Sequence, residues 1–144
     1  MKVKTILATK GTTVFTIRPE QTLMEAVALL GRHNVGALVV VDEAGNPLGI
    51  ISERDIVREA AHNEAVFAQA VSRVMTRNVI AGSPQDDLRS ALKTMTEKHF
   101  RHLPIMDRGK LAGIVSIGDM VKAQIDEYEG EIETLQTQVT ARQA

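Results

Sequence analysis

The 144-residue chain contains no cysteine and no tryptophan, and aromatic residues make up only 3% of it. Without cysteine there can be no disulfide, no thiol nucleophile and no thiolate metal site. So few aromatic side chains also disfavour a platform on which the bases of single-stranded nucleic acid could stack. Because 44% of the residues are hydrophobic, the core must instead be aliphatic, and it suffices for one domain or two tightly packed halves.

The chain also lacks a dominant charge, with 17 basic and 18 acidic residues and a formal net charge of −1. No basic stripe marks a nucleic-acid-binding face, and no apolar run approaches the roughly 20 residues that cross a bilayer. Basic residues open the chain, but the apolar residues 6–8 that follow are too few for a secretory signal peptide. These features predict a cytoplasmic protein that binds neither nucleic acid nor membrane.

The strongest pattern in the sequence is an internal repeat, which is sought first because it decides the fold. Residues of the first copy recur 65 positions later, and after a one-residue deletion in the second copy they recur 64 positions later. Chance does not explain so many collinear matches. The matched pairs are Pro19 and Pro84, Leu23 and Leu88, Ala26 and Ala91, Leu38 and Leu103, Asp42 and Asp107, then Gly49 and Gly113, Ser52 and Ser116, Asp55 and Asp119, and Val57 and Val121.

Each copy has the same predicted order of elements, β-α-β-β-α. A short strand (13–17 or 78–81) leads through a proline turn to an amphipathic helix, which in the first copy starts with a capping box of Thr22 and Glu25. A continuous apolar strand and a third strand follow, as in sheets covered by helices. Since neither copy buries its faces alone, we predict an α/β (α+β) fold in which the copies pack about a pseudo-two-fold axis.

These elements divide the chain into repeat 1 over residues 10–62, a helical connector over 63–77, repeat 2 over 78–124 and a C-terminal amphipathic helix over 125–144. Apolar residues of the last helix are spaced 4-3-4-3-4, which is a heptad seam, although Gly130 costs about 1 kcal/mol relative to alanine. We expect this helix to pack on a partner subunit or on the module's flank, the alternative being a frayed solvent helix. The seam residues are Val121, Ile125, Tyr128, Ile132, Leu135 and Val139.

The doubled Gly-Ile-(Ile/Val)-Ser-x-x-Asp block, the apolar strand ending in Asp and the proline-led helix resemble a pair of cystathionine-β-synthase (CBS) domains, a Bateman module. The resemblance covers residues 10–124. It implies a stand-alone regulatory module, a homodimer stacked as a disc, that binds an adenosine nucleotide and transmits its state to a regulated partner. AMP, ADP and ATP are the leading ligands, and NAD(H) is a further candidate because its adenylate half is the same. The alternative is a ligand-free dimerisation or adaptor domain.

Ser52 with Asp55, and Ser116 with Asp119, lie where each third strand passes into a helix. Such a pair is an ordinary helix start, with Ser as the N-cap. The same helix N-terminus also presents N–H groups and a positive dipole end to phosphate, and a carboxylate can accept both hydrogen bonds of a ribose diol. The resemblance implies these phosphate and ribose roles for Ser and Asp, and they are compatible with capping.

Basic residues distinguish the two copies. Arg54 could clamp a phosphate or be an exposed first-turn residue, and its counterpart is Gly118. The resemblance implies that Arg101 and His102 reach the phosphates of the site in their own repeat, while His102 could instead be a structural histidine whose charge depends on pH. The two sites are therefore predicted to be chemically unequal.

The remaining candidates surround a slot for adenine, and each could equally be ordinary core or surface. Backbone groups of the first strands would read the polar edge of the base, and apolar side chains would pack on its faces. The candidates are Thr16, Ile17, Ile80 and Ala81 for the edge, Ile50, Pro104 and Ile114 for the faces, Gly36 and Ala37 as the copy-one counterparts of Arg101 and His102, and Lys10 for a phosphate.

No catalytic constellation is evident. His99 and His102 form only a weak i,i+3 pair, and neither a Walker loop nor a Rossmann fingerprint is present. The adjacent Asp86 and Asp87 stand at a helix start, where negative charge is favoured in any case. The sequence therefore predicts a binding module and not an enzyme.

Overall fold

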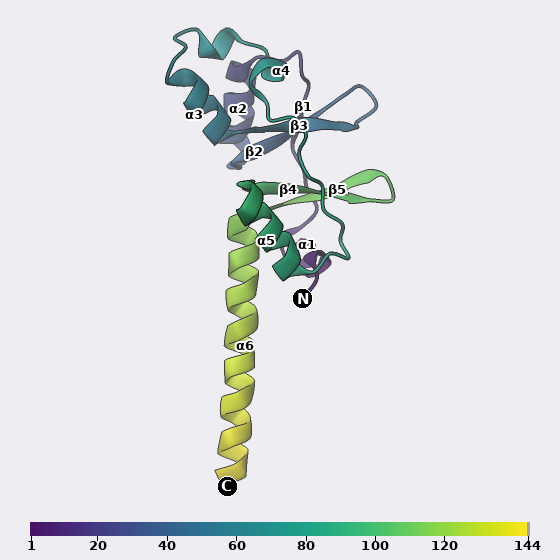
Figure 1. The fold of residues 1–144 in the computed structure, drawn as a ribbon, viewed down its shortest axis with the longest axis vertical. Helices are drawn as coiled ribbons and strands as arrows, with labels where there is room; N and C mark the ends of the chain where they lie inside the picture. The colour runs from purple at the N-terminus through teal and green to yellow at the C-terminus, as the bar shows by residue number, and fades with distance from the viewer. Residues whose placement is uncertain (144) are drawn as a thin grey trace.

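The computed structural model describes residues 1–143 and has two lobes, one for each repeat, with the last helix extending from the second (Figure 1). This mixed α/β fold with a C-terminal helix confirms the predicted class; the last residue of the helix expected over 125–144 lies outside the described part. The first lobe contains β1 (Thr16–Ile17), α2 (Leu23–His33), β2 (Ala37–Val41), β3 (Pro47–Ser52) and α3 (Glu53–Ala60), and the second contains α5 (Leu88–Lys98), β4 (His102–Asp107), β5 (Lys110–Ser116) and α6 (Ile117–Gln143).

The sheet of the first lobe has the order β1-β2-β3, with β1 parallel and β3 antiparallel to β2. All five residues of β2 are buried, because helices cover the sheet that this strand centres. Thr22 caps helix α2 as predicted, with its hydroxyl accepting a hydrogen bond from the Glu25 N–H at 3.2 Å. The capping box is only half formed, because the Glu25 carboxylate accepts from the Thr22 hydroxyl at 3.4 Å and not from its backbone N–H. It ends at Asn34, whose left-handed backbone (φ 52°) stops the helix just before β2.

The first strand of the second copy, predicted over 78–81, is not a strand. Only Gly82 pairs with the sheet, as a parallel bridge to Ile105, in the place that Ile17 takes beside Val40 in the first lobe. Asn78 has a φ of 56°, which an extended chain does not adopt. The strand predicted over 13–17 is likewise reduced to the two residues of β1.

A helix that the sequence did not reveal, α1 (Val3–Lys10), packs into the second lobe. The N–H of Val3 donates to the carbonyl of Asp86 at 2.9 Å, and the N–H of Lys4 donates to that of Pro84 at 2.9 Å. Val3, Ile6 and Leu7 belong to the core of that lobe. The segment that precedes repeat 1 therefore completes repeat 2.

The segment between the repeats makes the reciprocal contact. The helical connector predicted over residues 63–77 consists of two short helical pieces, η1 (Val66–Ala68) and α4 (Val71–Val74). The N–H of Val71 donates to the carbonyl of Gln21 at 2.7 Å, and that of Ser72 donates to Pro19 at 2.9 Å, as Val3 and Lys4 do in the other lobe. This exchange of equivalent segments is the structural expression of the pseudo-two-fold relation between the repeats.

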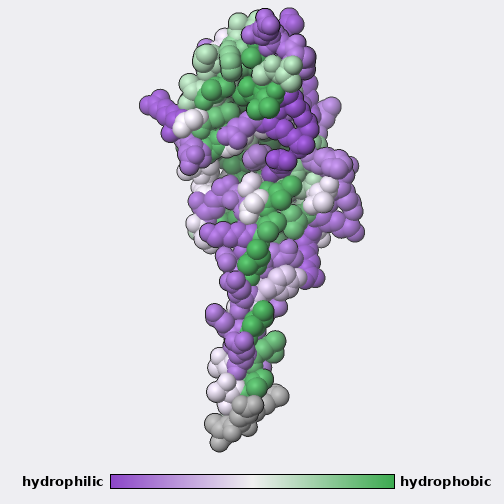
Figure 2. Space-filling model, turned by 90° about the vertical axis from the view of Figure 1, so that its left-hand side faces the viewer, coloured by the Kyte–Doolittle hydropathy of each residue, from purple (hydrophilic) through white to green (hydrophobic). Residues whose placement is uncertain are grey.

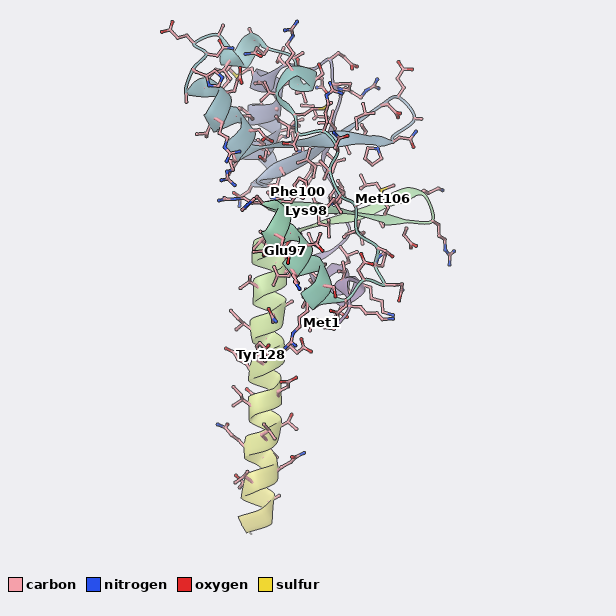
Figure 3. All side chains as sticks on the ribbon, in the orientation of Figure 1. Met1, Glu97, Lys98, Phe100, Met106 and Tyr128 are labelled. Atoms are coloured by element: carbon pink, nitrogen blue, oxygen red, sulfur yellow. The ribbon has the colours of Figure 1, made fainter. Side chains whose placement is uncertain are left out.

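Each lobe has its own hydrophobic core, and both are aliphatic as the composition requires. The first turns of α6 pack beside α1 and α5: the hydroxyl of Tyr128 accepts a hydrogen bond from Arg89 at 2.7 Å, and the amino group of Met1 lies 3.9 Å from Glu127 (Figure 3). Beyond these residues, α6 extends away from both lobes (Figure 1). Within residues 1–143, no helix is long and apolar enough to span a membrane.

Candidate functional site

The start of α3 brings together the Ser and Asp of the first repeat. The N–H of Asp55 donates to Ser52 Oγ at 3.2 Å, and the N–H and hydroxyl of Ser52 donate to Asp55 Oδ2 at 2.9 and 3.0 Å. Thr76, from the segment after α4, donates its hydroxyl to Asp55 Oδ1 at 3.2 Å. The capping interpretation is therefore correct, and it fixes the carboxylate in a partly buried position beside a cavity.

A cavity of about 180 Å³ opens between the lobes at this helix start. Arg54 and Arg58 enter it from α3, and Arg101 and His102 enter it from the start of β4. The first lobe thus supplies the N-terminus of a helix, and the second lobe supplies positive charge opposite to it. The lining residues are Ile50, Ser52, Arg54, Asp55, Arg58, Thr76, Val79, His99, Phe100, Arg101 and His102.

The three arginines of this cavity form a concentrated positive charge. The guanidinium of Arg58, and next that of Arg101, lower the pKa of Arg54 from its ordinary value. None of the three forms an ion pair with an acidic side chain in the part of the chain that the structure describes. Asp55 acts on the pKa of Arg54 in the opposite direction but does not outweigh the two arginines. The excess positive charge is suited to an anionic ligand.

The placement of Arg101 and His102 differs from the sequence prediction. We expected them in a site with Ser116 and Asp119 of their own repeat, but they line the cavity of Ser52 and Asp55. A β-carbon on Gly36 would lie 3.5 Å from Nε2 of His102. His102 therefore lies beside Gly36, the residue of the first repeat that corresponds to Arg101. Burial lowers the pKa of His102, and Lys10 and Arg101 act in the same direction, against Asp119 and Asp55.

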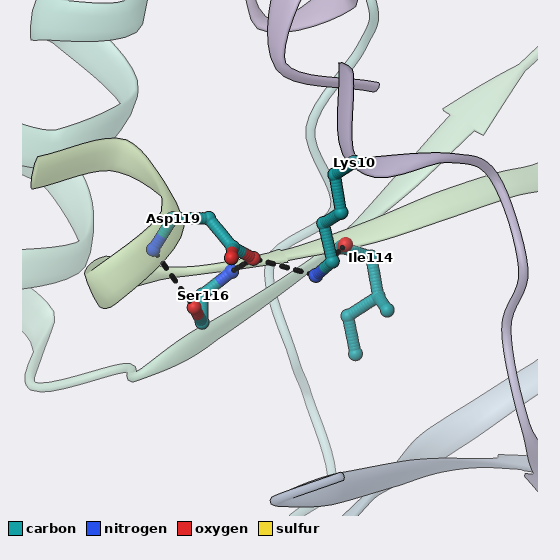
Figure 4. A network of polar contacts seen from close by, with 4 residues as sticks. All are labelled: Lys10, Ile114, Ser116 and Asp119. Atoms are coloured by element: carbon teal, nitrogen blue, oxygen red, sulfur yellow. Dashed lines mark hydrogen bonds and ion pairs between the residues drawn. The ribbon is translucent and has the colours of Figure 1, made fainter. Parts of the chain in front are cut away.

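The corresponding carboxylate of the second repeat is already engaged (Figure 4). Asp119 and Ser116 form the same helix start, with backbone N–H bonds of 2.9 and 3.0 Å. In addition, Lys10 at the end of α1 donates its ammonium group to Asp119 Oδ2 at 2.5 Å and to the carbonyl of Ile114 at 2.8 Å. Burial acts to raise the pKa of Asp119, but the hydrogen bonds from Lys10 and Ser116 prevail and lower it.

The other predicted residues lie outside the arginine cavity, except that Ile50 lines it. Ile80 and Ala81 line a separate cavity with Asp86 and Asp87. Pro104 lines another beside Pro47. Thr16 and Ile17 form β1, and Ala37 begins β2, where Ile17 and Ala37 belong to the core.

Sequence reasoning missed several residues of the cavity. Arg58 lies one helical turn after Arg54, so the i,i+4 spacing on an expected helix could have found it. Thr76 lies in what we took as a connector, and no local signal marks it. The residues missed are Arg58, Thr76, Val79, His99 and Phe100. Over residues 1–143, no group of three metal-ligating side chains is brought together.

Comparison with known proteins identifies the repeat. The family model described as the CBS domain matches residues 3–62 and 71–126, so that it includes α1 and α4. An uncharacterised 17.7 kDa protein of Acidianus ambivalens is 40% identical over 126 residues, which are 87% of this chain and 74% of that protein. The CBS domain-containing protein YhcV of Bacillus subtilis is 37% identical over 117 residues, which are 81% of this chain and 83% of that protein.

Solved structures share the whole two-lobed arrangement. A CBS-domain containing protein from Agrobacterium tumefaciens superimposes with a TM-score of 0.82 at 42% identity, covering 86% of this chain and 99% of that one. The CBS domain pair of protein MJ0100, in complex with 5′-methylthioadenosine and S-adenosyl-L-methionine, superimposes with a TM-score of 0.79 at 28% identity, covering 88% and 98%.

Proposed function

The chain belongs to the CBS-domain family, and we propose that it is a regulatory module that binds an adenine nucleotide in the cavity between Asp55 and Arg101. The observation that carries this proposal is the trio of arginines without acidic partners beside the N-terminus of α3. A phosphate group there meets the positive end of the helix dipole and guanidinium donors together, although the N–H groups of Glu53 and Asp55 are already bonded to Gly36 and Ser52.

The residues around the arginines suit the remaining parts of a nucleotide. Asp55 presents a partly buried carboxylate for the ribose diol, after its Oδ1 exchanges the hydroxyl of Thr76 for that of the sugar. Ile50, Val79 and Phe100 supply apolar surface for the base. The ligands named for MJ0100 share the adenosine group, which supports the adenosine part of the proposal for this chain.

The charge of the cavity separates the candidate ligands. 5′-Methylthioadenosine is neutral and the sulfonium centre of S-adenosylmethionine is positive, whereas three arginines favour phosphate groups. Among the predicted ligands, ATP and ADP offer more negative charge than AMP, and NAD(H) offers a pyrophosphate. We therefore rank ATP and ADP first, with AMP and NAD(H) behind them.

Calorimetric titration with AMP, ADP, ATP, NADH, S-adenosylmethionine and GTP tests this function. We expect ATP to bind at least about tenfold more tightly than S-adenosylmethionine, because a single charge-assisted hydrogen bond contributes about 1.5–3 kcal/mol. GTP measures the contribution of phosphate without adenine. If no adenine compound binds at millimolar concentration, the proposal is wrong and the ligand-free adaptor interpretation takes its place.

Lys10 makes a second prediction about occupancy. Since its ammonium group holds Asp119 Oδ2 and the carbonyl of Ile114, a ribose must displace it to reach the second site. We expect the wild-type chain to bind one nucleotide per chain and Lys10→Met to bind two, as measured by calorimetric stoichiometry. Lys4→Met is the matched control, because Lys4 is an exposed residue of the same helix. Two equivalents bound by the wild type, or one by Lys10→Met, would show that Lys10 does not close the site.

A further inference from the structure

Helix α6 carries along most of its length an apolar face that remains exposed beside and below the lobes. Figure 2 shows it as a green stripe running down the helix below the lobes. Its residues are between 41 and 60% exposed, which is unusual for six large apolar side chains on one helix. Burial of such a face, more than helix propensity, normally stabilises a helix in water. The residues of this seam are Val121, Ile125, Tyr128, Ile132, Leu135 and Val139.

We propose that the seam is covered by α6 of a second copy, and that the two helices form a parallel two-stranded coiled coil. The spacing places Ile125, Ile132 and Val139 at heptad position a, and Val121, Tyr128 and Leu135 at position d. Among parallel coiled coils, β-branched residues at a with leucine at d favour two strands over three or four. Here all three of these a residues are β-branched, and Leu135 is the leucine at d. The identity of the residues at position a therefore favours two helices when the helices run parallel, which the bare heptad pattern does not.

The charges beside the seam agree with this pairing. In a parallel pair, each g residue faces an e residue of the partner; Gln124 then faces Glu129, and Glu131 faces Gln136. No glutamate opposes another glutamate across the interface, although the helix is rich in acidic residues. The remaining acids, Glu127 and Glu133 among them, lie away from the seam at b and c positions.

The opposite face of α6 is suited to solvent. Thr134 donates its hydroxyl to the carbonyl of Gly130 at 2.9 Å, and Thr137 donates to that of Glu133 at 2.9 Å. The hydroxyl groups of these side chains are satisfied on their own helix, so this face needs no partner. This inference rests on α6 alone and does not depend on nucleotide binding.

Cysteine cross-linking tests the inference cleanly, because the chain has no cysteine of its own. In a parallel pair Val139 meets Val139 of the second copy, so Val139→Cys should form a disulfide-linked dimer under mild oxidation. Thr137→Cys, on the outer face, is the control. We expect Val139→Cys to cross-link roughly tenfold faster or more, because the coiled coil raises the effective concentration of the paired thiols. In an antiparallel pair Val139 would face an upstream residue, and the two variants would cross-link equally slowly.

A second pair of variants separates the seam from contacts between lobes. Adding Leu135→Asp to Val139→Cys should abolish the fast cross-linking, since it places two unpaired charges in the core of the coil. Adding Thr137→Asp instead should leave the rate within about twofold, because exposed substitutions cost little. Leu135 lies beyond the lobes, so neither substitution should change the melting temperature of the lobes. An unchanged melting temperature would show that the lobes of both variants remain folded. Equal rates for Val139→Cys and Thr137→Cys, or no effect of Leu135→Asp, would overturn the proposal.

Discussion

Gly49→Ala is expected to destabilise the first lobe by roughly 3 kcal/mol, the upper part of the usual range for overpacking. A β-carbon at Gly49 would lie 2.4 Å from the carbonyl oxygen of Thr76. That oxygen accepts the N–H of Ile50 at 3.0 Å, and the N–H of Thr76 donates to the carbonyl of Ile50 at 2.8 Å. Thr76 cannot retreat without breaking this pair of backbone bonds. Urea unfolding followed by circular dichroism would measure the loss.

The repeat supplies a matched control in Gly113→Ala. A β-carbon at Gly113 would lie 2.7 Å from Cδ2 of Leu7, and a leucine side chain can change rotamer where a backbone carbonyl cannot. We expect a cost of about 1 kcal/mol there. The two glycines occupy equivalent positions in the repeats and differ in the segment they face, the connector at Gly49 and α1 at Gly113. Equal losses of unfolding free energy in the two variants would therefore contradict this explanation.

The fold was predictable because the sequence contains two copies of the same repeat. Each matched position constrains the other copy, and patterns such as the buried strand β2 and the Thr22 cap are local enough to recognise in one sequence. The strand expected over 78–81 failed because the conformation of Asn78 depends on its surroundings. Helix α1 was missed for a related reason. Its buried residues Val3, Ile6 and Leu7 pack on residues more than 80 positions away, so no local pattern predicts the helix.

The candidate site was predictable only in its local parts. Ser52 and Asp55 are three residues apart, so a helix start brings them together whatever the fold. Arg101 lies far from them in sequence, and its approach to Arg54 is set by how the lobes face each other. The pairing of Lys10 with Asp119 spans 109 residues and has no sequence signal at all. The chemical difference between the two sites could be foreseen from Arg54 and Gly118, but the contact of Lys10 with Asp119 could not.

Arg54→Ala and Arg101→Ala are each expected to weaken ATP binding by roughly 10- to 100-fold, since each removes a charge-assisted contact of about 1.5–3 kcal/mol. The two residues approach the cavity from different lobes, so either loss leaves the other half of the phosphate site in place. Arg73→Ala is the control, because Arg73 is an exposed arginine of α4 that does not line the cavity. Calorimetric titration of the free protein would measure all three.

Adenosine distinguishes lost phosphate contacts from a damaged site, because it keeps the base and the ribose but has no phosphate. Its affinity should change less than about twofold in Arg54→Ala and Arg101→Ala, since neither arginine is assigned to the sugar or base. Raising the salt concentration should weaken ATP binding to the wild type more than to either variant, because fewer charges remain to be screened. If adenosine and ATP weakened equally, the arginines would be shaping the cavity and not holding phosphate. The ranking of ATP over S-adenosylmethionine would then lose its physical basis.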